Sequence, residues 1–123
     1  MMKILLVDDE ERLLHNLAFF FEDEGYDVVT AISGEEGLDQ LRQGGIEACI
    51  VDMRLPGIDG NEVIRTAMRE GLLHRFLIHT GSTDYRLPDD LLKMGMSEHH
   101  VFLKPIAEMT VLADAITALF EEN

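Results

Sequence analysis

The sequence predicts an α/β fold in which helices cover both faces of a parallel sheet of five strands. Short apolar runs alternate with segments of helical periodicity along the whole chain. Most of these runs are continuously apolar, which is typical of strands covered on both faces and therefore of parallel sheets. Several runs also end at a carboxylate, hydroxyl or ammonium group, and the edge where parallel strands end is where α/β sheets carry their chemistry.

The strands and the first helix follow from these patterns. The stripe from Leu13 to Phe21 predicts an amphipathic helix that ends near Gly25, with Phe19 lying outside the stripe. Apolar runs, or in one case a β-branched run, predict strands at 3–7, 27–31, 47–51, 76–79 and 101–103.

Most of the other helices are marked by helix-capping residues or by a proline that suits a helix start. Ser33 with Glu36 three residues later is a capping-box signature. Pro88 suits a first helical turn, so the fourth helix is expected to start late. Asp59 is interpreted as the cap of the third helix. These four helices are expected at about 33–44, 59–71, 88–95 and 109–120.

Length and charge exclude several classes of function. At 123 residues the chain is expected to form one domain, 1–123, with no output domain. The formal net charge of −14 argues against direct binding to nucleic acid or to an anionic membrane, because such binding relies on Lys and Arg. No apolar run approaches the roughly 20 residues of a membrane span. The start shows no signal-peptide pattern, so the expected location is the cytoplasm.

Five side chains at strand ends form the candidate site. Asp8 and Asp9 follow the first strand, Asp52 the third, Thr80 the fourth and Lys104 the fifth. Three carboxylates at one sheet edge need a cation, and ligands that are all oxygen suit Mg²⁺. A nucleophile, a metal cage, a hydroxyl and a lysine together indicate phosphoryl transfer.

This ordered set resembles the receiver domain of two-component response regulators, over essentially the whole chain. The resemblance implies a flavodoxin-like (βα)5 fold with strand order 2-1-3-4-5. It also implies that Asp52 takes a phosphoryl group from a sensor histidine kinase or a histidine phosphotransfer protein. The signal would reach a downstream protein through the surface of the fourth helix, fifth strand and fifth helix. The matching residues are Asp8-Asp9, Asp52, Pro56-Gly57, Asp59-Gly60, Thr80-Gly81 and Lys104-Pro105.

The resemblance further assigns a role to each site residue. Asp52 is the phosphoacceptor, Lys104 contacts the phosphoryl oxygens, and the hydroxyl of Thr80 moves to meet them. Mn²⁺ is an acceptable substitute for Mg²⁺. The implied metal ligands are Asp9, Asp52, the backbone carbonyl of Arg54, and Asp8 acting through water. Whether the chain forms a homodimer is left open.

Two features depart from the usual receiver pattern. Receivers commonly carry Tyr or Phe three residues before the lysine, where this chain has Val101. The neighbouring Phe102 is expected on the opposite face of the strand. The loop 82–87, which contains Tyr85, is therefore expected to be the mobile element of the switch.

Two other functions remain as alternatives. An Asp-nucleophile phosphatase of the haloacid dehalogenase type would need a second Asp two residues after the nucleophile, where Arg54 stands. A binding module that signals without phosphate is favoured only by Val101.

Glu10 and Glu11 are expected merely to add to the local negative field. Cys49 is expected to be buried, and structural or surface roles are expected for His15, His74, His79, His99 and His100.

Overall fold

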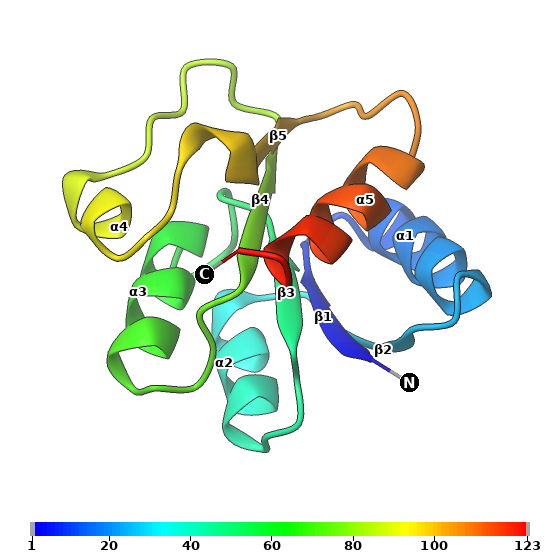
Figure 1. Cartoon of the computed structure of the whole chain (residues 1–123), viewed down its shortest axis with the longest axis horizontal. Helices are drawn as coiled ribbons and strands as arrows, with labels where there is room; N and C mark the ends of the chain where they lie inside the picture. Colours follow the sequence, from blue (N-terminus) through cyan, green and yellow to red (C-terminus); the bar gives the residue numbers. More distant parts are fainter. Residues whose placement is uncertain (1, 123) are drawn as a thin grey trace.

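The computed structural model describes residues 2–122 and has the expected flavodoxin-like architecture. The five strands are all parallel and lie in the order β2-β1-β3-β4-β5, so the strand order implied by the family resemblance is confirmed (Figure 1). The strands are β1 (Lys3–Val7), β2 (Asp27–Ala31), β3 (Ala48–Val51), β4 (Phe76–Thr80) and β5 (Val101–Leu103).

Helices cover both faces of this sheet. Helices α1 and α5 contribute buried side chains to one face, and α2, α3 and α4 contribute them to the other. A short 3-10 helix, η1, precedes β5 and was not expected from the sequence. The helix bounds are α1 (Glu11–Asp23), α2 (Gly34–Arg42), α3 (Gly60–Arg69), α4 (Asp89–Lys93), η1 (Glu98–His100) and α5 (Thr110–Leu119).

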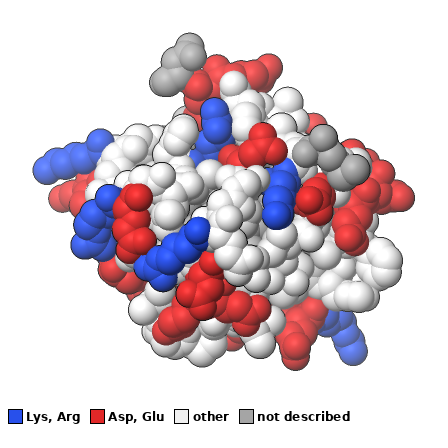
Figure 2. All heavy atoms as spheres, turned by 90° about the horizontal axis from the view of Figure 1, so that it is seen from below, with Lys and Arg blue, Asp and Glu red and all other residues white. Residues whose placement is uncertain are grey.

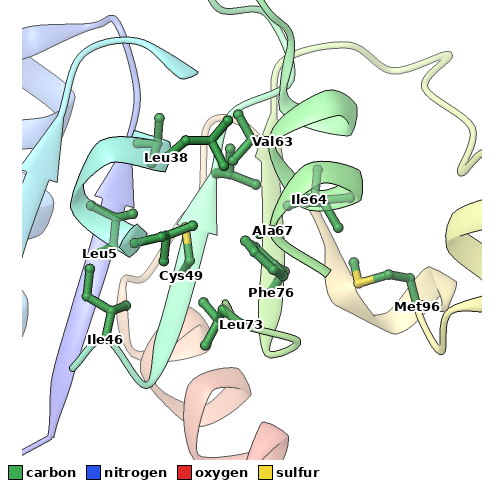
Figure 3. Close-up of a cluster of buried hydrophobic side chains, with 14 of the residues drawn as sticks. Leu5, Leu38, Ile46, Cys49, Val63, Ile64, Ala67, Leu73, Phe76 and Met96 are labelled. Carbon is green, nitrogen blue, oxygen red and sulfur yellow. The ribbon is translucent and has the colours of Figure 1, made fainter. Parts of the chain in front are cut away.

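Strand periodicity divides the core into two layers. Alternate residues of each strand point to opposite faces, so Leu5 and Cys49 face α2 and α3 while Ile4 and Ile50 face α1 and α5. Figure 3 shows the first of these layers, in which Cys49 lies between the sheet and the two helices. The expected burial of Cys49 is confirmed.

The edge strand β5 is less covered than the sequence predicted. Strands β1, β3 and β4 are almost entirely buried, but Val101 and Phe102 are only partly buried and Leu103 is 49% exposed. The reason is the position of β5 at the end of the sheet, where the helices wrap only part of the strand. Val101 and Phe102 do pack on opposite layers, as period-two alternation predicted.

Local capping sets where α2 and α3 begin. The hydroxyl of Ser33 accepts a hydrogen bond from the Glu36 N–H at 3.1 Å. The carboxylate of Asp59 accepts from the Glu62 N–H at 2.9 Å, which confirms its expected role as a cap. Both caps satisfy N–H groups that have no partner inside the helix. The second of them fixes α3 directly behind the loop that follows β3.

Charges of both signs share the surface at the end of the molecule where the strands begin. Figure 2 looks at this face from below, and there the Lys and Arg side chains lie beside acidic ones instead of forming a continuous basic patch. Pairs such as Arg42 with Glu70, at 3.0 Å, account for part of this mixture. Among residues 2–122, none of the helices is both long enough and apolar enough to cross a membrane.

Helix α4 is held to the sheet mainly by one buried side chain, which gives a first prediction. Leu91 is fully buried, whereas the adjacent Leu92 is 44% exposed. Leu91→Ala should lower the free energy of unfolding by about 2–5 kcal/mol, because it leaves a cavity in the core. Leu92→Ala, the matched control, should change it by less than about 0.5 kcal/mol. Urea titration followed by circular dichroism measures both, and equal effects would show that α4 is not anchored in this way.

Candidate functional site

Four strand ends bring Asp8, Asp52, Thr80 and Lys104 together at one edge of the sheet. Backbone hydrogen bonds extend the ladders to these residues, from Asp52 N to Val7 O at 2.9 Å and from Lys104 N to Thr80 O at 2.8 Å. Asp8, Asp52 and Thr80 are buried, and the Lys104 side chain is only 14% exposed. The site therefore rests on the rigid frame of the sheet.

Asp9 joins this edge from the start of the loop after β1. One carboxylate oxygen from each of Asp8, Asp9 and Asp52 lies within 4.8 Å of the others. Asp8 and Asp52 are buried while Asp9 is exposed, so the cluster has a closed side and an open side. Oxygen ligands of this kind suit a hard divalent cation such as Mg²⁺, which keeps several waters and takes few protein carboxylates.

Lys104 is the one cation that the described residues place among these carboxylates. Its Nζ lies 2.9 Å from Asp8 Oδ2, 3.1 Å from Glu10 Oε2 and 3.5 Å from Asp52 Oδ2. The contact with Glu10 corrects the expectation that this residue only adds to the local field. The sequence does show Glu10 as a third acidic residue directly after Asp8-Asp9. Its contact with Lys104, however, is created only by the fold.

The crowding changes the acidity of the groups at the centre. Burial, and then the nearby charge of Asp8, raise the pKa of Asp52, against the opposing effects of Lys104 and of backbone N–H groups. Burial alone would lower the pKa of Lys104, but its hydrogen bond to Asp8 and the surrounding carboxylates outweigh burial and raise it. The ammonium thus stays charged while Asp52 carries an unfavourable excess of negative charge.

The loop after β3 is shaped by one close approach. A Cβ at Gly60 would collide with the backbone carbonyl of Asp52, so only glycine fits there. The carboxylate of Glu35 on α2 accepts a hydrogen bond from the Ile58 N–H at 3.2 Å and ties the loop down. Arg54 lies exposed in this loop, two residues after Asp52.

Thr80 connects the site to the loop before α4. Its hydroxyl accepts a hydrogen bond from the Ser82 N–H at 3.2 Å. Further along this loop, the Tyr85 hydroxyl donates to Asn61 Oδ1 on α3 at 2.6 Å. Burial raises the pKa of Tyr85 to about 12, so the phenol keeps the proton that it donates. Sequence reasoning missed Asn61, because nothing in the local pattern marks a partner 24 residues away.

His79 is a further residue whose setting the sequence did not reveal. It is buried on β4 beside Thr80, on the face of the sheet that α1 and α5 cover. Neither ring nitrogen has a hydrogen-bond partner among the described residues. Burial, with a smaller effect of the Lys104 charge, lowers the pKa of His79 to about 4. The imidazole is therefore neutral at physiological pH.

Comparison with known proteins gives a consistent result. The family model of the response regulator receiver domain matches residues 4–117. The uncharacterised transcriptional regulatory protein YkoG of Bacillus subtilis is 31% identical over 120 residues, which cover 98% of this chain and 51% of that protein. The alkaline phosphatase synthesis transcriptional regulatory protein PhoP of the same species is 32% identical, over 90% of this chain and 45% of PhoP. The chain spans about half the length of these relatives.

Solved structures show the same fold. A response regulator receiver domain from Clostridium thermocellum is 31% identical with a TM-score of 0.82, over 98% of this chain and 95% of that one. The response regulator TrrA from Thermotoga maritima, solved in complex with Mg²⁺ and BeF, is 27% identical with a TM-score of 0.81. That match covers 97% of this chain and 99% of TrrA.

The charge crowding around Asp52 predicts how stability depends on pH. Because its pKa is raised by folding, this carboxyl favours the folded state at low pH, and that contribution is lost as the pH rises through the folded pKa. In the absence of divalent cations, Asp52→Asn should therefore be more stable than the wild type at neutral pH. The difference in stability between this variant and the wild type should shrink as the pH falls toward the ordinary pKa of aspartate.

Thermal unfolding at several pH values in EDTA tests this second prediction. Asp114→Asn on the exposed side of α5 removes the same charge away from the site, and should not reproduce the effect. A less stable Asp52→Asn protein at neutral pH would mean that its attraction to Lys104 outweighs the crowding.

Proposed function

Because the chain belongs to the response regulator receiver family, matched over residues 4–117, we propose that it accepts a phosphoryl group on Asp52. The donor is a phosphohistidine on a sensor histidine kinase or a histidine phosphotransfer protein. The observation that carries the proposal is the position of Asp52, which is buried at a strand end within a triad of carboxylates and 3.5 Å from the ammonium of Lys104. We propose Asp52, Thr80 and Lys104 as the reacting set.

The residues at this edge fit a divalent cation. Two buried carboxylates and one exposed carboxylate lie close together with a single ammonium to neutralise them, so a further positive charge relieves repulsion. We propose that Asp9, Asp52 and the backbone carbonyl of Arg54 hold Mg²⁺, with Asp8 acting through water and Mn²⁺ able to replace it. The cation supplies neutralisation of charge on the phosphoryl oxygens.

The transfer itself exchanges one bond to phosphorus for another. A carboxylate oxygen of Asp52 forms the new O–P bond as the N–P bond to the donor imidazole breaks, and the electron pair of that bond returns to the ring nitrogen. A carboxylate is a weak nucleophile, so the protein must hold the phosphoryl group in line and spread its charge. Lys104 provides a point charge for the phosphoryl oxygens, and Thr80 provides a hydroxyl that turns toward them.

The movement of Thr80 suggests how the signal leaves the site. When its hydroxyl turns to the phosphoryl group, the Ser82 N–H loses its partner, and the loop 82–87 must find a new arrangement. In the structure Tyr85 holds that loop to Asn61 on α3, and Tyr85 and Val101 both pack against the core layer that α2, α3 and α4 cover. We propose that this loop, with α4, changes the surface of α4, β5 and α5 that a downstream protein reads.

The similar proteins in Bacillus subtilis are named transcriptional regulators and are about twice as long as this chain. An acidic surface of this kind is better suited to a protein partner than to DNA, so we propose that the output of these residues passes through protein contacts. A homodimer through the same surface is one such contact.

The third prediction concerns labelling by a small phosphoryl donor. Incubation with acetyl phosphate and Mg²⁺ should add one phosphoryl group to the wild type, seen as a mass shift by intact mass spectrometry under acid quench. Asp52→Asn should abolish the label, because an amide keeps the shape but is a poor nucleophile. Asp114→Asn, which removes a charge from the exposed side of α5 instead of the acidic site, should label normally.

Three outcomes separate the candidate functions. A stable, Mg²⁺-dependent adduct on Asp52 supports the receiver function, continuous hydrolysis of the donor indicates a phosphatase, and the absence of any adduct indicates a phosphate-independent binding module. Asp9→Ala should need far more Mg²⁺ for the same labelling rate. An unchanged requirement would show that Asp9 is not a ligand.

The fourth prediction tests the loop as the moving element. Beryllofluoride with Mg²⁺ should slow amide hydrogen exchange most strongly between Thr80 and about Met94. Tyr85→Phe removes the hydroxyl bond to Asn61, so it should speed exchange in this loop before the analogue is added and cost about 0.5–1.5 kcal/mol of stability. Tyr26→Phe is the matched control. Protection confined to Asp52 and Lys104 would show that the signal does not leave through this loop.

A further inference from the structure

A second cluster of metal-binding residue types lies at the opposite edge of the sheet. His99 and His100 belong to η1, directly ahead of β5, and Glu122 follows the end of α5. This cluster therefore lies where β5 begins and α5 ends. The acidic site, by contrast, lies where the strands end. The sequence predicts only structural or surface roles for these histidines, because their spacing does not match a metal-site pattern. The fold supplies the third member of the cluster from 22 residues beyond His100.

The three side chains converge on one point. Glu122 Oε1 lies 3.0 Å from His99 Nε2 and 2.9 Å from His100 Nε2. All three ligand atoms lie within 4.8 Å of one another. A tetrahedral zinc site with bonds of about 2.0–2.2 Å separates its ligand atoms by roughly 3.4 Å. Moving each side chain by a few tenths of an ångström would therefore make room for the ion.

We propose that His99, His100 and Glu122 form a binding site for Zn²⁺ or a similar transition-metal cation. Two imidazoles and one carboxylate favour such a cation over Mg²⁺, which prefers oxygen ligands. Three protein ligands leave a fourth position for water. A cavity of about 310 Å³ borders His100 and Glu122 and provides the room for that water and a path for the ion.

The surroundings of His99 already favour this use. The hydroxyl oxygen of Ser97 lies 2.6 Å from the Nδ1 of His99 and 3.3 Å from its Nε2, and Nε2 also lies 3.0 Å from Glu122 Oε1. A histidine ligand usually donates its second ring N–H to an oxygen atom, and the Ser97 hydroxyl is the oxygen within reach of His99 Nδ1. The end of α5 is fixed as well, because the guanidinium of Arg75 stacks on the Phe120 ring with its carbon 4.3 Å from the ring centroid.

His100 must change its protonation pattern to bind the ion. Its Nδ1 accepts a hydrogen bond from the Ser97 N–H at 3.0 Å, so in the metal-free protein the ring proton lies on Nε2 and is donated to Glu122. Metal binding at Nε2 requires the neutral ring to carry its proton on Nδ1 instead. The hydrogen bonds from the Ser97 N–H to Nδ1 and from Nε2–H to Glu122 are then both lost, and a metal–imidazole bond and a metal–carboxylate bond would take their place. This exchange gives the site a spectroscopic signature at Ser97.

The proposed ion would join two parts of the fold. It would fasten η1, and through it the start of β5, to the end of α5. Because both segments flank the surface proposed for signal output, bound metal would make that surface more rigid. Binding only to the folded state would also raise the melting temperature with increasing zinc concentration.

The fifth prediction tests this site with Zn²⁺ itself, on the full chain freed of any histidine tag. Saturating Mg²⁺ and an Asp52→Asn background suppress binding at the acidic site. Calorimetric titration should then show one zinc per chain, and Co²⁺ should give the visible absorption bands of tetrahedral coordination. His99→Ala and Glu122→Gln should each weaken binding at least tenfold. The His99 side chain is 72% exposed and the Glu122 side chain 39% exposed, so neither variant opens the core, and circular dichroism verifies that both fold.

His15→Ala on α1 is the matched control and should bind zinc as the parent protein does. Zinc should also shift the Ser97 amide resonance strongly in the parent and not in His99→Ala. Binding that is equally weak in the parent and in both cluster variants would overturn the proposal, as would tight binding that neither variant affects. Labelling of Asp52 by acetyl phosphate does not depend on these residues, so either proposal can fail without the other.

Discussion

The contact between the Lys104 ammonium and the buried carboxylate of Asp8, at 2.9 Å, is the interaction on which the site depends. Without it the sheet would end in two buried carboxylates with no counter-charge. Leaving buried charges without a partner destabilises a fold strongly, because their loss of hydration is not compensated. The parallel ladder enforces this meeting, because β1, β3 and β5 all finish at the same edge. A single cation shared among Asp8, Asp52 and Glu10 leaves the cluster short of positive charge. That shortage of positive charge supports the proposal that a divalent cation binds at this edge.

The sequence predicted the fold well because its elements are marked locally. The bounds of β2 were predicted residue for residue from a β-branched run, and the late start of α4 from Pro88. Asp59 was interpreted as a helix cap because a single Asp after a strand is more often a cap than a ligand, and the structure confirms it. The order of the strands came from the family resemblance, since adjacency in a sheet is decided by packing between elements that no local pattern records.

The parts of the site that the sequence did not predict are those built from distant pairs. Glu10 meets Lys104 across 94 residues, and Tyr85 meets Asn61 across 24. The exposure of Leu103 follows from the place of β5 at the edge, which a run of apolar letters does not reveal. In each case the missing information is a tertiary distance. The roles assigned to Asp8, Asp9, Asp52, Arg54, Thr80 and Lys104 remain proposals that labelling and metal titration test.

The bond between Glu10 and Lys104 has a consequence for the threshold of the response. Glu10 is 60% exposed and immediately precedes α1, so of the three carboxylates around Lys104 it can return to water at the lowest cost. In the structure its carboxylate occupies the Lys104 ammonium that the proposed phosphoryl group would also contact. Under the proposed phosphotransfer, the phosphoryl group would have to displace the Glu10 carboxylate from Lys104 before it could bind there.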